Sequence, residues 1–343
     1  MVAPALSHVS QLHYACGKPS ATALIRRQPE DFRVTEQLSF PLDGEGQHVF
    51  LFIQKSNLNT DQVSAALAKF ANVKQVAVGY AGLKDRQAVT RQWFSVDLAG
   101  KPEPDWSSLE SDDLKVLEVT RHGRKLKRGA IAANHFELVL AEFEGEREEM
   151  EQRLQKIKLS GVPNYFGEQR FGRNEANLRQ AEKMMTNDKL RIKRHQRSLY
   201  LSAARSFLFN MVLSQRVADQ TWNSALAGDV FMLDGSHSIF VPEEIDDDIK
   251  RRVADGDIHP TGPLWGVGEL MTQHSVLQLE RQVLEAYPQW RELLEKAGMK
   301  QERRALRLPV NAMESDWRDK DVVLKFGLPA GSYATVVLRE LIS

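Results

Sequence analysis

The chain has 343 residues, of which 42% are apolar and 27% are charged. This length suits two domains, and the composition is typical of a folded protein, which excludes a chain that is disordered throughout. The 46 basic and 46 acidic residues cancel, which excludes a uniformly basic surface but leaves local basic patches open.

The sequence has no feature of a secreted or membrane protein. The N-terminal residues lack a basic segment followed by an apolar core, and no apolar run approaches the length that spans a bilayer. The single cysteine, Cys16, cannot form an internal disulfide, which is typical of a reducing compartment. We therefore expect a cytoplasmic protein.

The first 140 residues are predicted to be rich in strands. Short apolar or alternating segments are separated by turn residues, and a helix with Val63, Leu67 and Phe70 on one face interrupts them. Its N-cap is predicted at Thr60 or Asp61. The predicted strands are residues 24–25, 32–34, 48–53, 76–80, 92–96, 115–119 and 136–140.

The pattern becomes helical after about residue 143. Short strands and loops are predicted over residues 228–268, and strands return at 322–326 and 335–338. This order favours a sheet domain interrupted by a helical domain, although three consecutive units fit the periodicity as well. The predicted helices are residues 144–158, 174–185, 198–217 and 275–297, the last broken or kinked at Pro288.

Common cofactor and metal signatures are absent from the sequence. There is no G-x-G-x-x-G after a strand, no G-x-x-x-x-G-K-[ST] and no G-x-S-x-G elbow. The nine histidines and one cysteine show no zinc spacing. We therefore expect neither a cofactor nor a metal.

One segment, VGYAGLKDRQAVTRQWF, is the most informative. Its Asp85 lies in a predicted loop between two strands, directly after Lys84 and before Arg86, with two glycines shortly before. Glycines let a ligand approach the backbone, and flanking cations favour an ionised carboxylate that can act as a nucleophile or base. The alternative is an aspartate held in a hairpin turn by local hydrogen bonds, which the spacing alone favours.

This segment resembles the catalytic signature of the TruD family of tRNA pseudouridine synthases, G-x-x-G-x-K-D-x-x-A-x-T-x-Q. The resemblance continues in the order of the family from about residue 17 to the end of the chain. The other matching segments are PEDF-x-V-x-E from Pro29, RKL…G…N-x-F from Arg124, GVPNYFG-x-QRFG from Gly161, LYLSAAR from Leu199 and LPAGS-x-AT from Leu328.

The resemblance implies an α/β (α+β) fold, with a pseudouridine synthase catalytic domain whose sheet is mixed and largely antiparallel. An inserted, mainly helical TruD-specific domain is expected at residues 160–305, and the catalytic domain at 1–159 and 306–343. The implied reaction is the isomerisation of uridine to pseudouridine, at position 13 of tRNA, by a monomer that consumes no cofactor. The implied partner is tRNA, with no obligate protein partner and no membrane.

The resemblance also implies roles for single residues. Asp85 is the expected nucleophile or base, and it acts on a uridine that has been flipped out of the RNA stack. Arg26 stands where the family commonly has lysine, and either cation can pair with the aspartate. The residues expected to bind the flipped base, by aromatic surfaces and edge contacts, are Arg26, Phe32, Lys84, Asn134, Phe136 and Tyr333.

Two basic runs, residues 121–128 and 189–197, are expected to guide the RNA backbone, and a third cluster lies at 300–307. Each Lys or Arg that neutralises a phosphate releases counterions. The alternative for each run is an ordinary solvated surface. The residues expected to contact phosphates are Arg121, Arg124, Lys125, Lys127, Arg128, Lys193 and Arg194.

Two other functions compete with this interpretation. An RNA-binding protein without catalysis would keep the basic runs, but it would not need Asp85 in its GLKD context. A glycosidase would pair Asp85 with a second carboxylate, either Glu36 or Glu340, but it would leave the basic runs unexplained.

Overall fold

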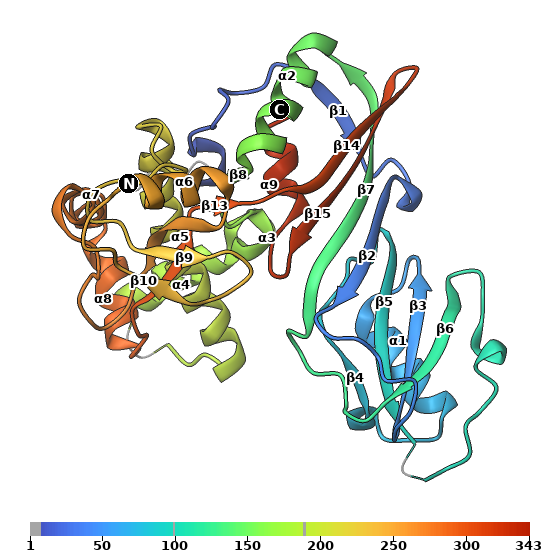
Figure 1. Ribbon diagram of the computed structural model, residues 1–343. Coiled ribbons are helices and arrows are strands. Elements are labelled where there is room, and N and C mark those ends of the chain that lie inside the picture. Colours follow the sequence, from blue (N-terminus) through green and yellow to red (C-terminus); the bar gives the residue numbers. More distant parts are fainter. Residues whose placement is uncertain (1–7, 99, 188–189) are drawn as a thin grey trace. The chain divides into compact units, whose positions relative to one another are not determined.

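The computed structural model describes residues 8–98, 100–187 and 190–343, which fold as two compact units (Figure 1). The sheet unit comprises Ala21–Glu149 and Val310–Ser332. The helical unit comprises the described residues up to Ser20, together with Met150–Pro309 and Tyr333–Ser343. None of the helices in these described ranges is long and apolar enough to cross a membrane.

The sheet unit is built on a nine-stranded sheet in the order β14-β15-β7-β2-β5-β3-β6, with β1 added beside β7 and β4 beside β5. Strands β2 and β5 are parallel, and the other neighbouring pairs in this sheet are antiparallel. The prediction of a mixed, largely antiparallel sheet is therefore confirmed. The strands are β1 Thr22–Ile25, β2 Phe32–Leu38, β3 His48–Lys55, β4 Val78–Tyr80, β5 Val89–Asp97, β6 Leu114–His122, β7 Ile131–Glu144, β14 Asn311–Arg318 and β15 Asp321–Pro329.

Helix α1 (Thr60–Phe70) covers one face of β3 and β5 (Figure 1). Its buried Val63 and Leu67 belong to the same apolar cluster as residues of both strands. The predicted N-cap is wrong by one residue, because the Asn59 side chain accepts a hydrogen bond from the backbone N–H of Gln62 at 2.9 Å. The hydroxyl of Thr60 points instead to the side chain of Gln92, at 2.9 Å from its Oε1.

The helical unit surrounds a small sheet in the order β10-β9-β11-β12, with β8 and β13 paired separately. The break predicted at Pro288 is confirmed, since α7 ends at Glu285 and Pro288 begins α8. The elements are α2 Arg147–Ser160, β8 Val162–Pro163, α3 Glu168–Phe171, α4 Ala176–Thr186, α5 Arg194–Ala218, β9 Phe231–Leu233, β10 Ile239–Phe240, α6 Asp247–Asp255, β11 Ile258–Leu264, α7 His274–Glu285, α8 Pro288–Lys296, β12 Glu302–Ala305, β13 Arg307–Leu308 and α9 Ala334–Arg339.

The strand predicted at residues 335–338 is wrong, because Ala334–Arg339 forms helix α9. Val336, Val337 and Leu338 are all buried. A short helix that is buried on most of its sides shows no amphipathic period, so its β-branched run resembles a strand. Tertiary packing then overrides the local preference for extended structure.

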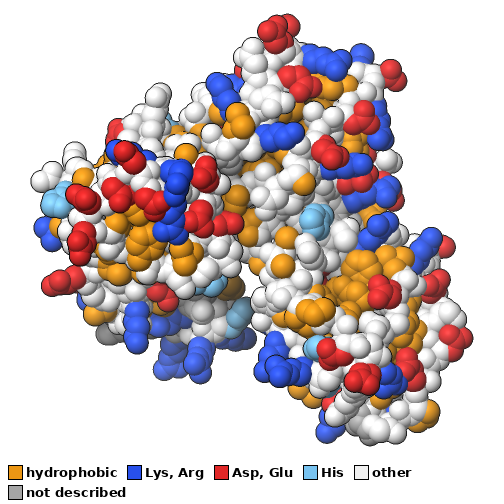
Figure 2. Space-filling model, in the orientation of Figure 1, with side chains coloured by type: hydrophobic (Ala, Val, Ile, Leu, Met, Phe, Trp, Pro, Cys, Tyr) orange, Lys and Arg blue, Asp and Glu red, His pale blue; other side chains and the backbone are white. Residues whose placement is uncertain are grey.

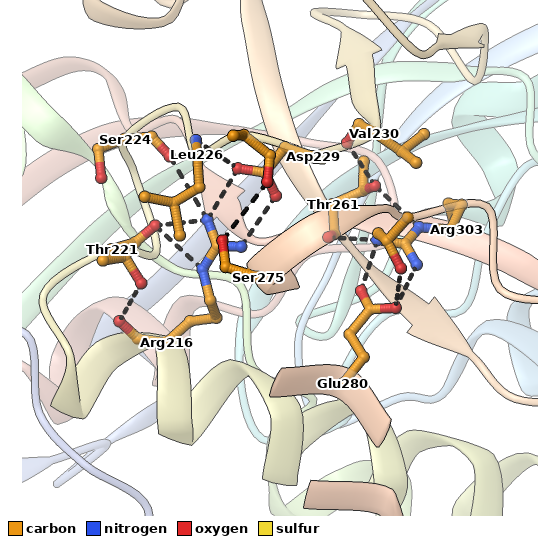
Figure 3. A network of polar contacts seen from close by, with 12 residues as sticks. Arg216, Thr221, Ser224, Leu226, Asp229, Val230, Thr261, Ser275, Glu280 and Arg303 are labelled. Atoms are coloured by element: carbon orange, nitrogen blue, oxygen red, sulfur yellow. Dashed lines mark hydrogen bonds and ion pairs between the residues drawn. The ribbon is translucent and has the colours of Figure 1, made fainter. Parts of the chain in front are cut away.

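Two buried ion pairs stabilise the interior of the helical unit (Figure 3). Arg216 on α5 donates to both carboxylate oxygens of Asp229, at 2.8 and 3.1 Å. Arg303 on β12 donates to both oxygens of Glu280, at 3.0 and 2.8 Å. Each of these two guanidinium groups thus has its own bidentate carboxylate, which is the arrangement that compensates the desolvation of an arginine.

Glu340, close to the C-terminus, connects the described N-terminal residues to the helical unit. Its Oε2 accepts backbone N–H groups from Ala15 and Cys16 at 3.0 and 3.3 Å, and its carbonyl accepts from Arg153 at 3.1 Å. This explains why the described N-terminal residues belong to the same unit as the C-terminal residues. The unit boundaries at 149/150 and 309/310 therefore differ from the expected insertion at 160–305, whose identity as a TruD-specific domain stays a prediction.

Candidate active site

Asp85 lies in the loop between β4 and β5, with a side chain that is 49% exposed. Its Oδ2 accepts a hydrogen bond at 2.7 Å from Nη2 of Arg26, whose side chain is 28% exposed. A carboxylate of this kind is accessible to a ligand and is held in one direction by a single cation. The geometry therefore allows it to act as a nucleophile or base.

The residue before it, Lys84, is held in the opposite way. Its Nζ lies 2.8 Å from Oε2 of Glu36 on β2, and the two side chains are 7% and 0% exposed. The other oxygen of Glu36 accepts the backbone N–H of Trp93 at 3.2 Å. This pairing anchors the loop to the sheet, and substrate binding by Lys84 stays a prediction.

Backbone contacts fix the rest of the loop. The N–H of Lys84 donates to the Thr60 hydroxyl at 2.9 Å, and the side-chain amide of Gln92 donates to the carbonyl of Gly82 at 3.2 Å. Thr60 and Gln92 also contact each other. The start of α1 and the first half of β5 therefore hold the segment just before Asp85, which explains why an amide side chain stands at position 92.

Lys55 is a residue that sequence reasoning missed. It ends β3, is fully buried, and donates from Nζ to the carbonyl of Leu58 at 2.7 Å and to the carbonyl of Asp85 at 2.9 Å. Burial lowers the pKa of this ammonium to about 8, against the effect of the nearby Asp85 carboxylate. A lysine at the end of an apolar strand resembles a solvated residue in the sequence, so only the fold identifies its role.

Aromatic rings extend from the Arg26–Asp85 pair across the sheet. The guanidinium of Arg26 lies 3.9 Å from the centroid of the Phe32 ring, and Phe32 meets Phe136 edge-to-face at 6.2 Å. Phe136 stacks on Phe326 of β15 at 5.4 Å. Arg26 adopts a positive φ of 61°, which is uncommon for a residue with a side chain. The structure thus brings together four of the expected site residues.

Asn134 belongs to the same face of the sheet as these rings. In the register of β2 and β7 it lies opposite Glu36, while Phe136 lies opposite Val34, and alternate residues of a strand share a face. Its Oδ1 is buried and has no hydrogen-bond partner among the described residues. Tyr333, by contrast, belongs to the helical unit, where it stands at the N-cap position of α9.

The basic run at 121–128 divides into engaged and free cations. Arg121 pairs with Glu103, Lys125 donates to the carbonyl of Val76, and Arg128 stacks on the Tyr80 ring at 3.9 Å. Among the residues that the structure covers, the exposed Arg124 and Lys127 have no partner. These two are the members of the run whose charge is available to an anion.

In the second basic run, Lys193 and Arg194 are exposed at the start of α5, and Lys189 lies outside the described residues. Figure 2 shows Lys and Arg side chains gathered at the lower end of the visible face of the helical unit, below a region where Asp and Glu side chains are frequent. A chain without net charge therefore still carries local basic surface. Phosphate binding by either run stays a prediction.

The second carboxylate that a glycosidase needs is not available at the expected positions. The side chain of Glu36 is 0% exposed and is paired with Lys84, and that of Glu340 is 1% exposed and is paired with Arg339. A general acid must reach the glycosidic oxygen. Neither glutamate is accessible to a sugar, which argues against this alternative.

Known proteins resemble this chain over nearly its full length. The family model "tRNA pseudouridine synthase D (TruD)" matches residues 8–191 and 176–341. A tRNA pseudouridine synthase D of Methylococcus capsulatus is 50% identical over 329 residues, which cover 96% of this chain and 93% of the relative. The protein of the same name from Nitrosococcus oceani is 51% identical over 334 residues, with the same coverage.

The fold is also found in a solved structure. A crystal structure of a TruD protein from Methanosarcina mazei superposes with a TM-score of 0.74 and 22% identity, covering 96% of this chain and 95% of that chain. This likeness bears on the fold alone, and it agrees with the predicted α/β class. The family match and the relatives near 50% identity carry the assignment, and the chain belongs to the TruD family.

Proposed function

We propose that the protein is a tRNA pseudouridine synthase and that Asp85 is its catalytic nucleophile or base. The observation that carries the proposal is a contrast within one loop. Lys84 is buried against Glu36 of the sheet, while the carboxylate of Asp85 is half-exposed beside Arg26. The family membership of the chain supports the same activity.

The reaction breaks the C1′–N1 bond of a uridine and forms a C1′–C5 bond. The C5 proton leaves and N1 gains a proton, so no cofactor is consumed. Asp85 assists bond cleavage either by attacking the sugar or the base or by removing a proton from the sugar. Arg26 directs the carboxylate, because its Nη2 donates a hydrogen bond to Oδ2 of Asp85 at 2.7 Å.

A uridine within folded RNA must leave its stack before Asp85 can reach it. Phe32 and Phe136, which are 3% and 9% exposed, lie on the same side of the sheet as Arg26 and are proposed to pack beneath the base once it enters. Asn134 supplies an amide for the edge of the base, and its Oδ1 has no partner among the residues described. Tyr333 of the helical unit is proposed to contact the RNA substrate. We further propose that the modified uridine is at position 13 of tRNA. The protein is proposed to act as a monomer in the cytoplasm.

The direct experiment is pseudouridine formation on unmodified tRNA, with the product mapped to a nucleotide. We expect conversion at one position, 13, with no added metal or cofactor. Product at another single position would contradict the site within tRNA and leave the activity standing.

An RNA-binding protein without catalysis is the second candidate, and the exposed basic residues of both runs are the observation that favours it. It predicts tight tRNA binding by the wild-type protein with no pseudouridine at any position. A matched preparation of a family member with detectable activity serves as the control for the assay.

A further inference from the structure

Two arginines of the helical unit meet on one aromatic ring. Arg170 lies in the short helix α3 and Arg304 on strand β12. Their guanidinium carbons lie 5.1 and 4.2 Å from the centroid of the Phe166 ring. Two like charges are thus held close together at a partly buried position.

The hydrogen bonds of this pair go to neutral groups. Nη1 of Arg170 donates to the Ser202 hydroxyl at 3.1 Å, and Nη2 of Arg304 donates to Oδ1 of Asn164 at 2.6 Å. Across the described ranges, no carboxylate forms an ion pair with either arginine. Glu168, two residues before Arg170, is exposed, and side chains at that spacing on a helix do not face each other. Glu302, two residues before Arg304, is exposed and pairs with Arg205 instead.

Two buried arginines of the same unit do have acidic partners. Arg216 and Arg303 each hold a carboxylate by two hydrogen bonds (Figure 3). Burial, and then the neighbouring Arg170, lower the pKa of Arg304 to about 10, which shows that its charged form is held at a cost. Two neighbouring guanidinium groups that share one ring and have no carboxylate form a position suited to an external anion.

Further unpaired polar atoms belong to the same neighbourhood. Nε of Arg170 is buried without an acceptor in the described part of the chain, and so is the hydroxyl of Thr335 without a partner. A Cβ on Gly167 would lie 3.2 Å from that hydroxyl, so Thr335 adjoins the segment that carries Phe166 and Arg170.

We propose that Arg170 and Arg304 form a binding site for one phosphate of the RNA substrate backbone. The planar guanidinium fork matches phosphate oxygens and is the preferred side chain for such contacts. A phosphate would neutralise the like-charged pair and give the free N–H groups acceptors. This inference rests on the proposed function, since it takes RNA as the substrate.

The test is the salt dependence of tRNA binding by wild type and Arg170→Gln. Arg170 is the better position to change because its protein hydrogen bond is limited to Ser202, whereas Arg304 also holds Asn164. We expect the slope of log affinity against log salt to shrink by about 0.7 to 0.9, the value for one phosphate contact, with binding about tenfold weaker at low salt. Arg170→Lys should keep most of the slope, because the charge remains.

Arg251→Gln is the matched control, since Arg251 is an exposed arginine of the same unit that pairs with Asp248 on its own helix. Its slope should equal that of the wild type. A slope in Arg170→Gln that matches the wild type, with an unchanged melting temperature, would overturn the site. Stabilisation by inorganic phosphate that is lost in Arg170→Gln, with an unchanged tRNA slope, would assign a free phosphate ion and also overturn the RNA assignment.

Pseudouridine formation, measured on the same preparations, separates the two proposals. Product with an unchanged slope rejects the phosphate site and leaves the proposed function standing. A reduced slope without product by the wild type supports the phosphate site and rejects the catalytic function. A wild-type protein that binds no tRNA contradicts both.

Discussion

The adjacent residues Lys84 and Asp85 each form an ion pair, and the two pairs differ in their exposure to solvent. The Lys84–Glu36 pair lies within the sheet, with side chains 7% and 0% exposed, whereas the Arg26–Asp85 pair has side chains 28% and 49% exposed. A buried pair is costly to break, while an exposed pair contributes little to stability. The difference suggests that one pair holds the loop and the other is kept accessible for chemistry.

The largest expected effect is on the rate with Asp85→Asn. The substitution keeps the shape of the side chain but removes the charge, so pseudouridine formation should fall by about 10⁴-fold or more, as for other essential catalytic groups. Initial rates under single-turnover conditions check this. Retention of even a tenth of the rate would show that Asp85 is not the nucleophile or base.

The next effect is on stability, with Glu36→Gln. Lys84 would then be a buried charge without a carboxylate, which costs about 3 to 5 kcal/mol of unfolding free energy. Chemical denaturation measures it, with Glu314→Gln on the exposed strand β14 as the control. The double change Glu36→Leu and Lys84→Met should recover much of the loss, and an equally unstable double variant would refute the ion-pair explanation.

Lys55→Met tests the support beneath Asp85. The carbonyls of Leu58 and Asp85 would lose their donor, so the carboxylate would be held less firmly. We expect kcat to fall about tenfold to a hundredfold, with KM within about threefold, because an unsatisfied buried carbonyl costs about 1 to 3 kcal/mol. A change in KM alone would indicate a role in binding rather than in positioning.

The pKa of Lys55, lowered by burial to about 8, predicts opposite trends in rate and stability above that pH. Between pH 8 and the ordinary value of 10.5, the unfolded chain binds the proton that the folded chain has released. This component of stability therefore rises with pH, while the rate falls as the cation beside Asp85 is lost. Both trends should be absent in Lys55→Met, and their persistence would assign them to another group.

The smallest effect is expected for Arg26→Lys. Lysine keeps the positive charge, and an exposed ion pair contributes about 0 to 1 kcal/mol, so the rate should change by less than about fivefold. Arg26→Met should have a larger effect, because no cation then faces the carboxylate. Equal rates for the two variants would show that the charge of Arg26 is not used.

Much of the fold could be predicted from the sequence, because its long elements have clear periods. The strand-rich start, the amphipathic α1 and the break at Pro288 are local patterns. Helix α9 could not be predicted, since Val336 and Val337 are β-branched and buried. Helix α6 was overlooked in a region expected to hold strands and loops, although Asp246 caps it and Ile249 and Val253 give it a buried face.

Only those site residues that lie in segments resembling the family could be predicted from the sequence. Asp85 and Phe32 belong to segments that resemble the family, and the structure places both beside Arg26. Lys55 and the Arg170–Arg304 pair depend on which groups face each other after folding, and a single sequence does not contain that information. The role of Lys84 as an anchor likewise follows from its burial against Glu36.

The central claim is that the Lys84–Glu36 pair stabilises the loop while Asp85 of the Arg26–Asp85 pair performs the chemistry. One experiment on two variants tests this claim most directly. Single-turnover rate and unfolding free energy are determined side by side for Asp85→Asn and Glu36→Gln. We predict that Asp85→Asn abolishes turnover with a change in unfolding free energy within about 1 kcal/mol, and that Glu36→Gln loses about 3 to 5 kcal/mol while its folded fraction keeps measurable turnover. Equal losses of stability in the two variants, or an active Asp85→Asn, would contradict the account.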